Sequence, residues 1–524
     1  MLAAGLLGYW LIRQAAPPIS GSSPTVPKVG VPPQKTSATE PRPTKRADRD
    51  TFTDGRTIEL FGSCRPEEVI LHFPTQESFD SFLQALDPQA VRVLGTLDRL
   101  RAMRLGFTEK EEEYLAGLFR DENISIFKDL PRIPTPPRAV GGATEKVATA
   151  IGSKLLAWLG VTVDNSRWGA GVKVAVLDTG VVPHQGLPAR FDSIEIVPFP
   201  EDLAITHPHG TAVASMIAGT QRIAQGIAPS VSLISVRIAD ESGMSDDYFL
   251  AAGLLAAMDA GAEVINISMG GGGGGTLLSD AIALLQERGI LIVAAAGNNG
   301  ETMAKFPAAY PGVIGVGAVD ASGERMAFSN IGSELGMTAP GYGVNAASSN
   351  GGFISISGTS ASAPMVAAAI AATMSDGNGR RIGAAEAARL VMSLADDEGP
   401  PGFDPEYGSG VLNLGRVINR QVPGIHDAVV TWQERDGQDR VKVTIQNRGT
   451  STLINTRIET KTRSGSNSMI ATTIAPGASE SFSLPVILNP NGRTQVTSVA
   501  TLGNSAADVT PANNQRTDVI FDRR

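Results

Sequence analysis

The middle of the chain alternates short apolar runs with segments of helical periodicity. The apolar runs are short and rich in β-branched residues, which predicts buried strands. They occupy 172–177, 231–236, 264–269, 290–296 and 313–319. Helices are predicted between several of them, at 211–218, 247–260 and 277–288. Buried strands separated by helices favour a three-layer α/β fold with a parallel sheet, in which functional sites lie at the carboxyl ends of the strands.

The segment that precedes this region has a different order of elements. Strands are predicted at 68–73, 91–94, 102–107 and 124–127, with one helix at 78–86 and another that begins at Thr108. Glu111 stands three residues after Thr108, which is the spacing of a capping box. The order βαββαβ predicts a ferredoxin-like α+β domain. Because that fold serves many functions, it does not identify one by itself.

From about residue 425 onward the helical periodicity disappears. Apolar and polar residues alternate instead, with Gly, Asn and Pro between the alternating segments. These segments are 440–445, 454–460, 479–484 and 495–502. Alternation with a period of two predicts strands that bury one face, so we expect an antiparallel β-sandwich of about 100 residues.

The N-terminal residues are apolar and lead into a polar stretch. Residues 1–12 are too short to span a bilayer and lack the cationic leader of a standard signal peptide. We interpret them as an export segment or part of a membrane anchor, with a frayed apolar tail as the alternative. The predicted organisation is 1–14 export signal or anchor, 15–50 Pro/Ser/Thr-rich linker, 51–139 ferredoxin-like domain, 140–422 α/β domain and 423–524 β-sandwich. An exported location follows: periplasmic, extracellular or attached to the outer side of a membrane.

Composition narrows the class of protein further. The 524 residues are 42% hydrophobic and 19% charged, which is enough apolar material for sizeable cores. The formal net charge is -9 and no basic stripe is present, which argues against a nucleic-acid partner. Cys64 is the single cysteine, so no disulfide can form within the chain, and we expect a structural thiol there.

Three residues far apart in the chain stand where chemistry is expected. Asp178 ends an apolar strand and is followed by Thr-Gly, His209 opens a helix of small residues, and Ser360 precedes an Ala-rich helix. Each residue alone has an ordinary interpretation, as a turn residue, a surface histidine or a helix N-cap. Their joint occurrence at strand ends and helix mouths favours a functional site.

These segments resemble the subtilisin family of serine peptidases. The motifs are Asp178-Thr-Gly, His209-Gly-Thr and Gly-Thr-Ser360-Ala-Ser-Ala-Pro, in the chain order Asp, His, Ser that distinguishes this family from chymotrypsin-like enzymes and α/β-hydrolases. A fourth segment, 293–300, resembles the family's oxyanion-hole stretch and contains Asn298. The segment 258–271 resembles the strand that lines the substrate cleft. The resemblance covers about residues 165–415.

The resemblance implies a mechanism and a set of residues. Asp178, His209 and Ser360 would form the catalytic triad, with the Asn298 side chain donating to the oxyanion. The hydroxyl needs a base, the imidazole supplies one near neutral pH, and the carboxylate orients the imidazole. The residues expected to line the substrate cleft are Ser268, Met269, Gly270, Ala295, Ala296 and Gly297. The implied enzyme is a serine endopeptidase that acts on proteins or peptides through an acyl-enzyme, tolerates apolar side chains beside the cleaved bond, and requires no cofactor.

The flanking domains fit the same resemblance. A βαββαβ unit directly before such a catalytic domain looks like the family's inhibitory propeptide, whose C-terminal tail would be 128–140. The implied protein is a self-processing zymogen with its own propeptide as a partner, although a cluster of prolines at 131–137 obscures a cleavage point and leaves a retained domain as the alternative. The C-terminal segment loosely resembles bacterial adhesion-type immunoglobulin-like modules.

Some features depart from the family or stay open. Ala212 stands where the family often has a second histidine, and no Asp-x-Asp-x-Asp-Gly loop is present, so calcium stays open. Residues 270–275 are six glycines without the Lys that a phosphate-binding loop needs, and they are either a wall of the specificity pocket or a surface loop. His184 and His207 are expected to be ordinary loop histidines.

Two other classes of protein compete with this prediction. One is a non-catalytic descendant that binds peptides in the cleft, and the complete set of four candidate residues argues against it. The other is a different serine hydrolase such as a lipase. The chain contains no Gly-x-Ser-x-Gly sequence, which counts against a lipase.

Overall fold

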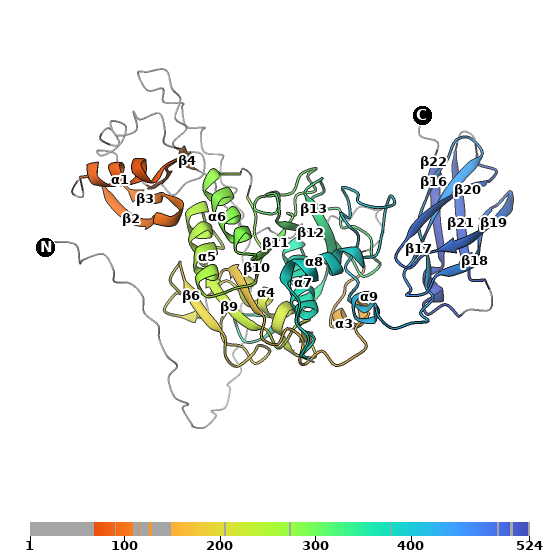
Figure 1. Ribbon diagram of the computed structural model, residues 1–524, viewed down its shortest axis with the longest axis horizontal. Helices are drawn as coiled ribbons and strands as arrows, with labels where there is room; N and C mark the ends of the chain where they lie inside the picture. The colour runs from red at the N-terminus through yellow and green to blue at the C-terminus, as the bar shows by residue number, and fades with distance from the viewer. Residues whose placement is uncertain are drawn as a thin grey trace, which may run out of the picture. The chain divides into compact units, whose positions relative to one another are not determined.

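The fold is described from a computed structural model of the chain (Figure 1). It describes residues 68–521 except 88, 90, 108–113, 115–124, 128–147, 204–205, 272–273, 378, 490–491 and 504–506. The predicted export segment, the linker, Cys64, most of the helix from Thr108 and the tail 128–140 therefore lie outside the described residues. Among the helices of the described residues, none is long and apolar enough to cross a membrane.

The predicted parallel sheet is confirmed, and it has seven strands. Their order is β13-β12-β11-β10-β5-β9-β6, and every neighbouring pair is parallel. The bounds are β5 Lys173–Asp178, β6 Asp192–Glu195, β9 Ser232–Arg237, β10 Val264–Ile267, β11 Leu291–Ala295, β12 Ile314–Val319 and β13 Leu335–Pro340. The edge strands β6 and β13 were not predicted, because β6 is polar and largely exposed and β13 carries a glycine and a proline.

Helices cover both faces of this sheet (Figure 1). Alternate side chains of β5 enter different cores: Val174 and Val176 join the core formed with α4 and α7, and Ala175 and Leu177 join the one formed with α5 and α6. The helices are α4 His209–Ala218, α5 Asp247–Asp259, α6 Thr276–Glu287 and α7 Thr359–Met374. Burial on both faces explains why the strands are apolar without alternation, and the three-layer α/β prediction is confirmed.

Smaller elements complete this region. They are α3 Leu155–Trp158, β7 Thr220–Gln221, β8 Ala224–Gln225, β14 Val344–Ala347, β15 Phe353–Ile356, α8 Ala384–Ser393 and α9 Leu414–Asn419. The strands β14 and β15 form an antiparallel hairpin, and α8 packs on α7.

The N-terminal part forms a four-stranded antiparallel sheet of order β2-β3-β1-β4. Its elements are β1 Glu68–His72, α1 Gln76–Ala85, β2 Arg92–Leu97, η1 Asp98–Leu100, β3 Ala102–Gly106 and β4 Ser125–Phe127. Phe79 and Phe82 of α1 pack with Phe73 in a core of their own. Thr75 caps α1 through a capping box with Ser78.

The C-terminal part consists of two antiparallel sheets. One contains β16 Ala428–Arg435, β17 Arg440–Asn447 and β20 Ser479–Pro485, and the other contains β18 Leu453–Thr462, β19 Gly465–Ile474, β21 Arg493–Thr501 and β22 Gln515–Phe521. A short helical turn, η3 Pro511–Asn513, precedes β22. Apolar side chains of both sheets, such as Val443 and Ile458, share one core.

Candidate active site

Two of the predicted residues, Asp178 and His209, are hydrogen-bonded to each other. Asp178 is the last residue of β5 and is fully buried, and His209 is the first residue of α4. The ring nitrogen Nδ1 of His209 lies 2.9 Å and 3.0 Å from the two carboxylate oxygens of Asp178. This contact requires Nδ1 to carry the proton, so Nε2 of a neutral ring is the basic atom.

The second ring nitrogen of His209, Nε2, differs from Nδ1. His209 Nε2 is buried, and it has no hydrogen-bond partner among the residues that the structure describes. Thr179 fixes the junction between the strand and the helix, because its hydroxyl donates to the carbonyl of His207 and accepts from the backbone N–H of Gly210. The imidazole is therefore held at Nδ1, while Nε2 is buried and makes no hydrogen bond to the described residues.

Ser360 lies in the first turn of α7 rather than before it, because the helix begins at Thr359 after an N-cap at Gly358. Pro364 is inside the helix and has no N–H, so the carbonyl of Ser360 lacks its usual i+4 donor. The hydroxyl of Ser268 supplies a donor at 3.0 Å. Ser268 therefore holds the backbone of the candidate nucleophile.

Asn298 is held by Thr359, a residue that the sequence analysis missed. The Asn298 Oδ1 accepts from the Thr359 backbone N–H at 2.8 Å and from its hydroxyl at 3.0 Å. Because Oδ1 accepts both hydrogen bonds from Thr359, the amide nitrogen Nδ2 points away from Thr359. Nδ2 is buried and has no partner within the described part of the chain. The Gly-Thr-Ser motif itself was the available signal for this second role of the threonine.

The free amide and the hydroxyl face one spot. The position that a Cβ of Gly358 would occupy lies 2.9 Å from Asn298 Nδ2 and 3.2 Å from Ser360 Oγ. Gly358 has a φ of 138°, which L side chains rarely adopt, so a side chain is excluded on two grounds. Glycine at this position therefore leaves the amide and the hydroxyl uncovered by a side chain of residue 358.

Strand order explains why distant residues converge here. Asp178 ends β5, Ser268 follows β10 and Asn298 follows β11, and these three strands are neighbours in the sheet. Helices α4 and α7, which carry His209 and Ser360 in their first turns, pack against each other. Parallel strands end at one edge, so the four candidate residues lie at the carboxyl edge of the sheet beside β5, where the strand order reverses.

The predicted cleft-lining residues lie on two segments at the same edge. Met269, Ala295 and Ala296 are fully buried, as is Ser268, while Gly270 is partly exposed. Gly297 has a φ of 110°, and its backbone N–H donates to the Thr359 hydroxyl. Since these side chains are buried or absent, any contact of the segments with a substrate runs through their backbone.

The remaining histidines differ from each other. His184 is an ordinary loop residue, with its Nε2 2.9 Å from the carbonyl of Gly352. His207 is less ordinary than expected, since its ring centroid lies 6.2 Å from that of His209 and its Nδ1 accepts from the His209 backbone. Burial, reinforced by the nearby His209, lowers the pKa of His207, while Asp178 and Asp240 act less strongly in the opposite direction. Ala212 is fully buried in α4.

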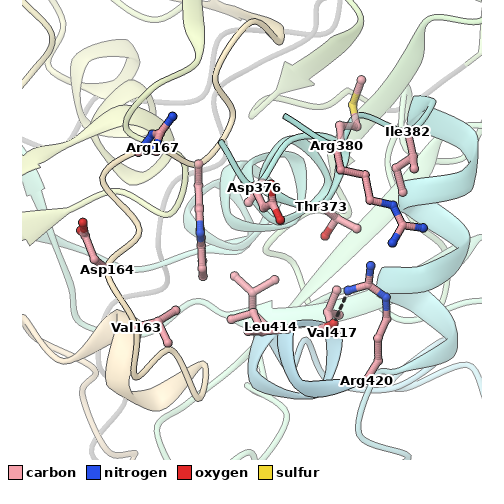
Figure 2. Close-up of a pocket in the computed structure, with 14 residues that line it drawn as sticks. Val163, Asp164, Arg167, Thr373, Asp376, Arg380, Ile382, Leu414, Val417 and Arg420 are labelled. Atoms are coloured by element: carbon pink, nitrogen blue, oxygen red, sulfur yellow. Dashed lines mark hydrogen bonds between the residues drawn. The ribbon is translucent and has the colours of Figure 1, made fainter. Parts of the chain in front are cut away.

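A separate cavity of about 400 Å³ lies near the other end of α7 (Figure 2). Its lining includes Thr373 from the last turn of this helix, about 20 Å along the helix from Ser360. Arg420 borders it and donates to the carbonyl of Val417, as Figure 2 shows. The cavity contains none of the candidate catalytic residues. Within the described ranges, no group of three or more His, Cys, Asp or Glu residues could hold a metal ion.

A carboxylate paired with an imidazole, and a serine hydroxyl close to an amide nitrogen, are the groups that a serine hydrolase uses, and here both pairs lie at the carboxyl edge of one parallel sheet. Comparison with known proteins gives the family. The profile of the subtilase family matches residues 169–410. The thermostable alkaline protease of Halalkalibacterium halodurans is 33% identical over 371 residues, which cover 67% of this chain and 92% of that protein.

A further relative, subtilisin Savinase, agrees on the kind of enzyme. Subtilisin Savinase of Lederbergia lenta is 37% identical over 205 residues, covering 39% of this chain and 76% of that protein. Among solved structures, the prenylagaramide maturation protease PagA is 32% identical, with a TM-score of 0.43, and the match covers 49% of this chain and 95% of that one. The chain belongs to the subtilase family, and it is a serine-type endopeptidase that hydrolyses proteins.

Proposed function

We propose that Asp178, His209 and Ser360 are the catalytic triad of this endopeptidase and that Asn298 donates to the oxyanion. The observation that carries the proposal is the state of the imidazole. His209 has one nitrogen bound to both oxygens of a fully buried carboxylate and the other nitrogen buried without a partner in the described residues. A merely structural histidine would satisfy both nitrogens.

The reaction follows from this arrangement. His209 Nε2 takes the proton of the Ser360 hydroxyl as Oγ attacks the peptide carbonyl, and the carbonyl oxygen becomes an oxyanion. Asp178 stabilises the imidazolium that forms. The imidazolium then gives its proton to the leaving amine, and the peptide C–N bond breaks. A water molecule, deprotonated by the same nitrogen, hydrolyses the resulting ester and restores the hydroxyl.

The oxyanion is where Asn298 acts in this proposal. Its Nδ2 is already desolvated and aimed beside Ser360 Oγ. A donor oriented before the reaction needs no rearrangement in the transition state, so it stabilises the developing charge more than the neutral carbonyl. The backbone N–H of Ser360, at the start of α7, is a second donor on the same side.

Labelling by a fluorophosphonate tests the assignment of the nucleophile. We expect a single adduct, located on Ser360 by peptide mass spectrometry, and no adduct in Ser360→Ala. Ser279→Ala, at an exposed serine of α6, is the matched control and should be labelled as the wild type is. An adduct that survives in Ser360→Ala, or a folded wild type that never reacts, would refute the triad and favour the peptide-binding alternative.

We also propose that residues 51–139 are an inhibitory propeptide with a ferredoxin-like fold. The order β2-β3-β1-β4 with α1 between β1 and β2 supports the fold. Contacts with the first turn of α6 and the N-cap of α5 support the role: His72 Nδ1 lies 2.9 Å from the hydroxyl of Thr276, and Arg104 Nη1 lies 3.4 Å from Oδ2 of Asp246. Ile70 joins the core on this side of the catalytic sheet.

Self-processing has a direct test. Ser360→Ala removes the proposed nucleophile, so this variant should accumulate as the uncleaved precursor, visible by its mass. Normal trimming of Ser360→Ala would mean that processing occurs in trans. The N-terminus of the mature protein, read by mass spectrometry, tests the proposed export at the same time.

The two C-terminal antiparallel sheets and their shared core support a β-sandwich module, for which we propose a binding or spacing role. For the catalytic step we propose no cofactor, because the proton transfers and the charge stabilisation use protein groups alone. Excess EDTA should then leave the rate of Ser360 labelling unchanged. Calcium that stabilises the fold would appear as a lower melting temperature instead.

A further inference from the structure

A lysine stands between the two segments that line the substrate cleft. The backbone N–H of Lys305 donates to the carbonyl of Ala296 at 2.8 Å. The next residue, Phe306, exchanges two backbone hydrogen bonds with Gly271, of 2.9 Å and 3.1 Å. The loop of Lys305 therefore joins the Gly-rich segment after β10 to the segment after β11.

The side-chain stem of Lys305 occupies the space next to both segments. A Cβ on Gly270 would lie 2.9 Å from Lys305 Cβ, and a Cβ on Gly297 would lie 2.7 Å from Lys305 Cγ. Only glycine fits at either position while the stem stays where it is. The side chain is 21% exposed, so most of the stem is packed between these two segments.

The charge at the tip is balanced by one carboxylate. Lys305 Nζ lies 2.6 Å from an oxygen of Glu301, whose side chain is 47% exposed. Asn330 holds the backbone of this loop, because its Oδ1 accepts from the N–H groups of Asn299 and Glu301. The ammonium is thus the more buried partner, and the carboxylate is the partner that water can solvate.

We propose, on the basis of the proposed function, that Lys305 makes this endopeptidase prefer an acidic residue on the acyl side of the cleaved bond, at the position called P1. A Glu or Asp side chain at P1 replaces Glu301 at the ammonium, and Glu301 turns to water at little cost because it is already half exposed. A large apolar P1 side chain instead desolvates the ion pair, and a basic one meets the ammonium. This ranking differs from the apolar tolerance that the family resemblance suggests.

Matched peptides test the preference. Four quenched fluorescent substrates that differ only at P1, with Glu, Gln, Leu or Lys, are cleaved by the purified protein, and each kcat/KM is expressed relative to Gln. We expect Glu to exceed its isostere Gln about threefold to fivefold, because one ion pair is exchanged for another and only the difference between them is gained. Lys305→Met keeps the stem and removes the charge, so the Glu/Gln ratio should fall to about one and Leu should gain.

Two further variants sharpen the result. Glu301→Gln removes the competing carboxylate and should raise the Glu/Gln ratio above the wild-type value. Lys442→Met breaks a similar ion pair with Glu434 in the C-terminal sheets and should leave the ratio unchanged. Ratios within one variant cancel any loss of total activity.

The outcomes separate this inference from the proposed function. A wild type that is labelled at Ser360 but prefers Leu or Lys at P1, or a Glu/Gln ratio that Lys305→Met does not change, overturns the role of Lys305 alone. A protein that is neither labelled at Ser360 nor able to cleave any of the peptides overturns both proposals.

Discussion

The candidate site has two halves, and they are held in different ways. In the acid–base half, His209 is gripped directly by the fully buried carboxylate of Asp178. In the oxyanion half, Asn298 is held indirectly, through two hydrogen bonds from Thr359. The first contact places a carboxylate beside the imidazole that gains a positive charge in the proposed reaction, whereas the second only orients a neutral amide. The comparison teaches that the site needs charge stabilisation on one side and orientation on the other.

The largest effect is expected in the acid–base half. Asp178→Asn keeps the size of the side chain but removes the charge and donates a hydrogen bond to the imidazole, which favours the wrong tautomer. We expect kcat to fall about 10⁴-fold near neutral pH, as the same change does in a serine-protease triad. Steady-state kinetics with a peptide substrate measures this. Asp192→Asn, at an exposed position of β6, should stay within error of the wild type.

A smaller loss is expected when the oxyanion donor is removed. Asn298→Ala should lower kcat by about 10² to 10³, the loss known for the oxyanion-hole asparagine of subtilisin, with little change in KM. The exposed neighbour Asn299→Ala is the control. Equal losses in kcat for both variants would show that the loss comes from a disturbed loop and not from the missing Asn298 amide.

The indirect support of the amide predicts a still smaller effect. Thr359→Val keeps the shape and the backbone N–H but removes the hydroxyl that bonds Asn298 and accepts from Gly297. The amide then keeps one of its two anchors, so we expect kcat to fall about tenfold with KM unchanged. Thr373→Val, at the other end of α7, is the matched control. In Asn298→Ala the threonine change should have almost no further effect, and additive losses would contradict the positioning role.

The smallest effect concerns stability and pH beside the acid–base half. The pKa of His207 is lowered in the folded protein, so at pH values just below 6.5 the unfolded chain binds more protons than the folded one. His207 therefore makes the free energy of unfolding rise with pH through that window, by at most about 1.4 kcal/mol per pH unit, and this contribution is lost on acidification. Burial also lowers the pKa of His72, which adds to the same slope. His207→Asn should flatten this slope. Urea unfolding at several pH values measures it, and an unchanged slope in the variant would falsify the assignment to His207.

The strands and helices of the catalytic region could be predicted from the sequence because they follow simple hydrophobic patterns. The apolar run at 172–177 and the small-residue helix after His209 appear as β5 and α4, within two residues of the expected bounds. The edge strand β6 could not be predicted, since its side chains are largely exposed and carry no apolar signal. The place of Ser360 inside the first turn of α7 also escaped, because helix ends depend on capping geometry that propensity does not resolve.

The hydrogen-bond partners of the site residues could not be predicted, because they lie on segments far apart in the sequence. The sequence motifs predicted the candidate residues Asp178, His209, Ser360 and Asn298. They did not predict the two hydrogen bonds from Thr359 to the Asn298 side chain, which join residues 61 positions apart. The bond from Ser268 to the carbonyl of Ser360 spans 92 residues, and the contacts of Lys305 with Gly270 and Gly297 exist only in the assembled fold. Sequence spacing carries no information about such pairs.

The sequence by itself determined the chemistry that is available: which residue can be a base, an acid or a nucleophile, and which runs must be buried as strands or helices. The tertiary structure alone decided which polar atoms of the site lie close to one another. The carboxyl edge of the parallel sheet brings the ends of β5, β10 and β11 together, whatever their separation along the chain. The physical reason is that side-chain type is local, whereas desolvation and hydrogen-bond direction are properties of the assembled fold.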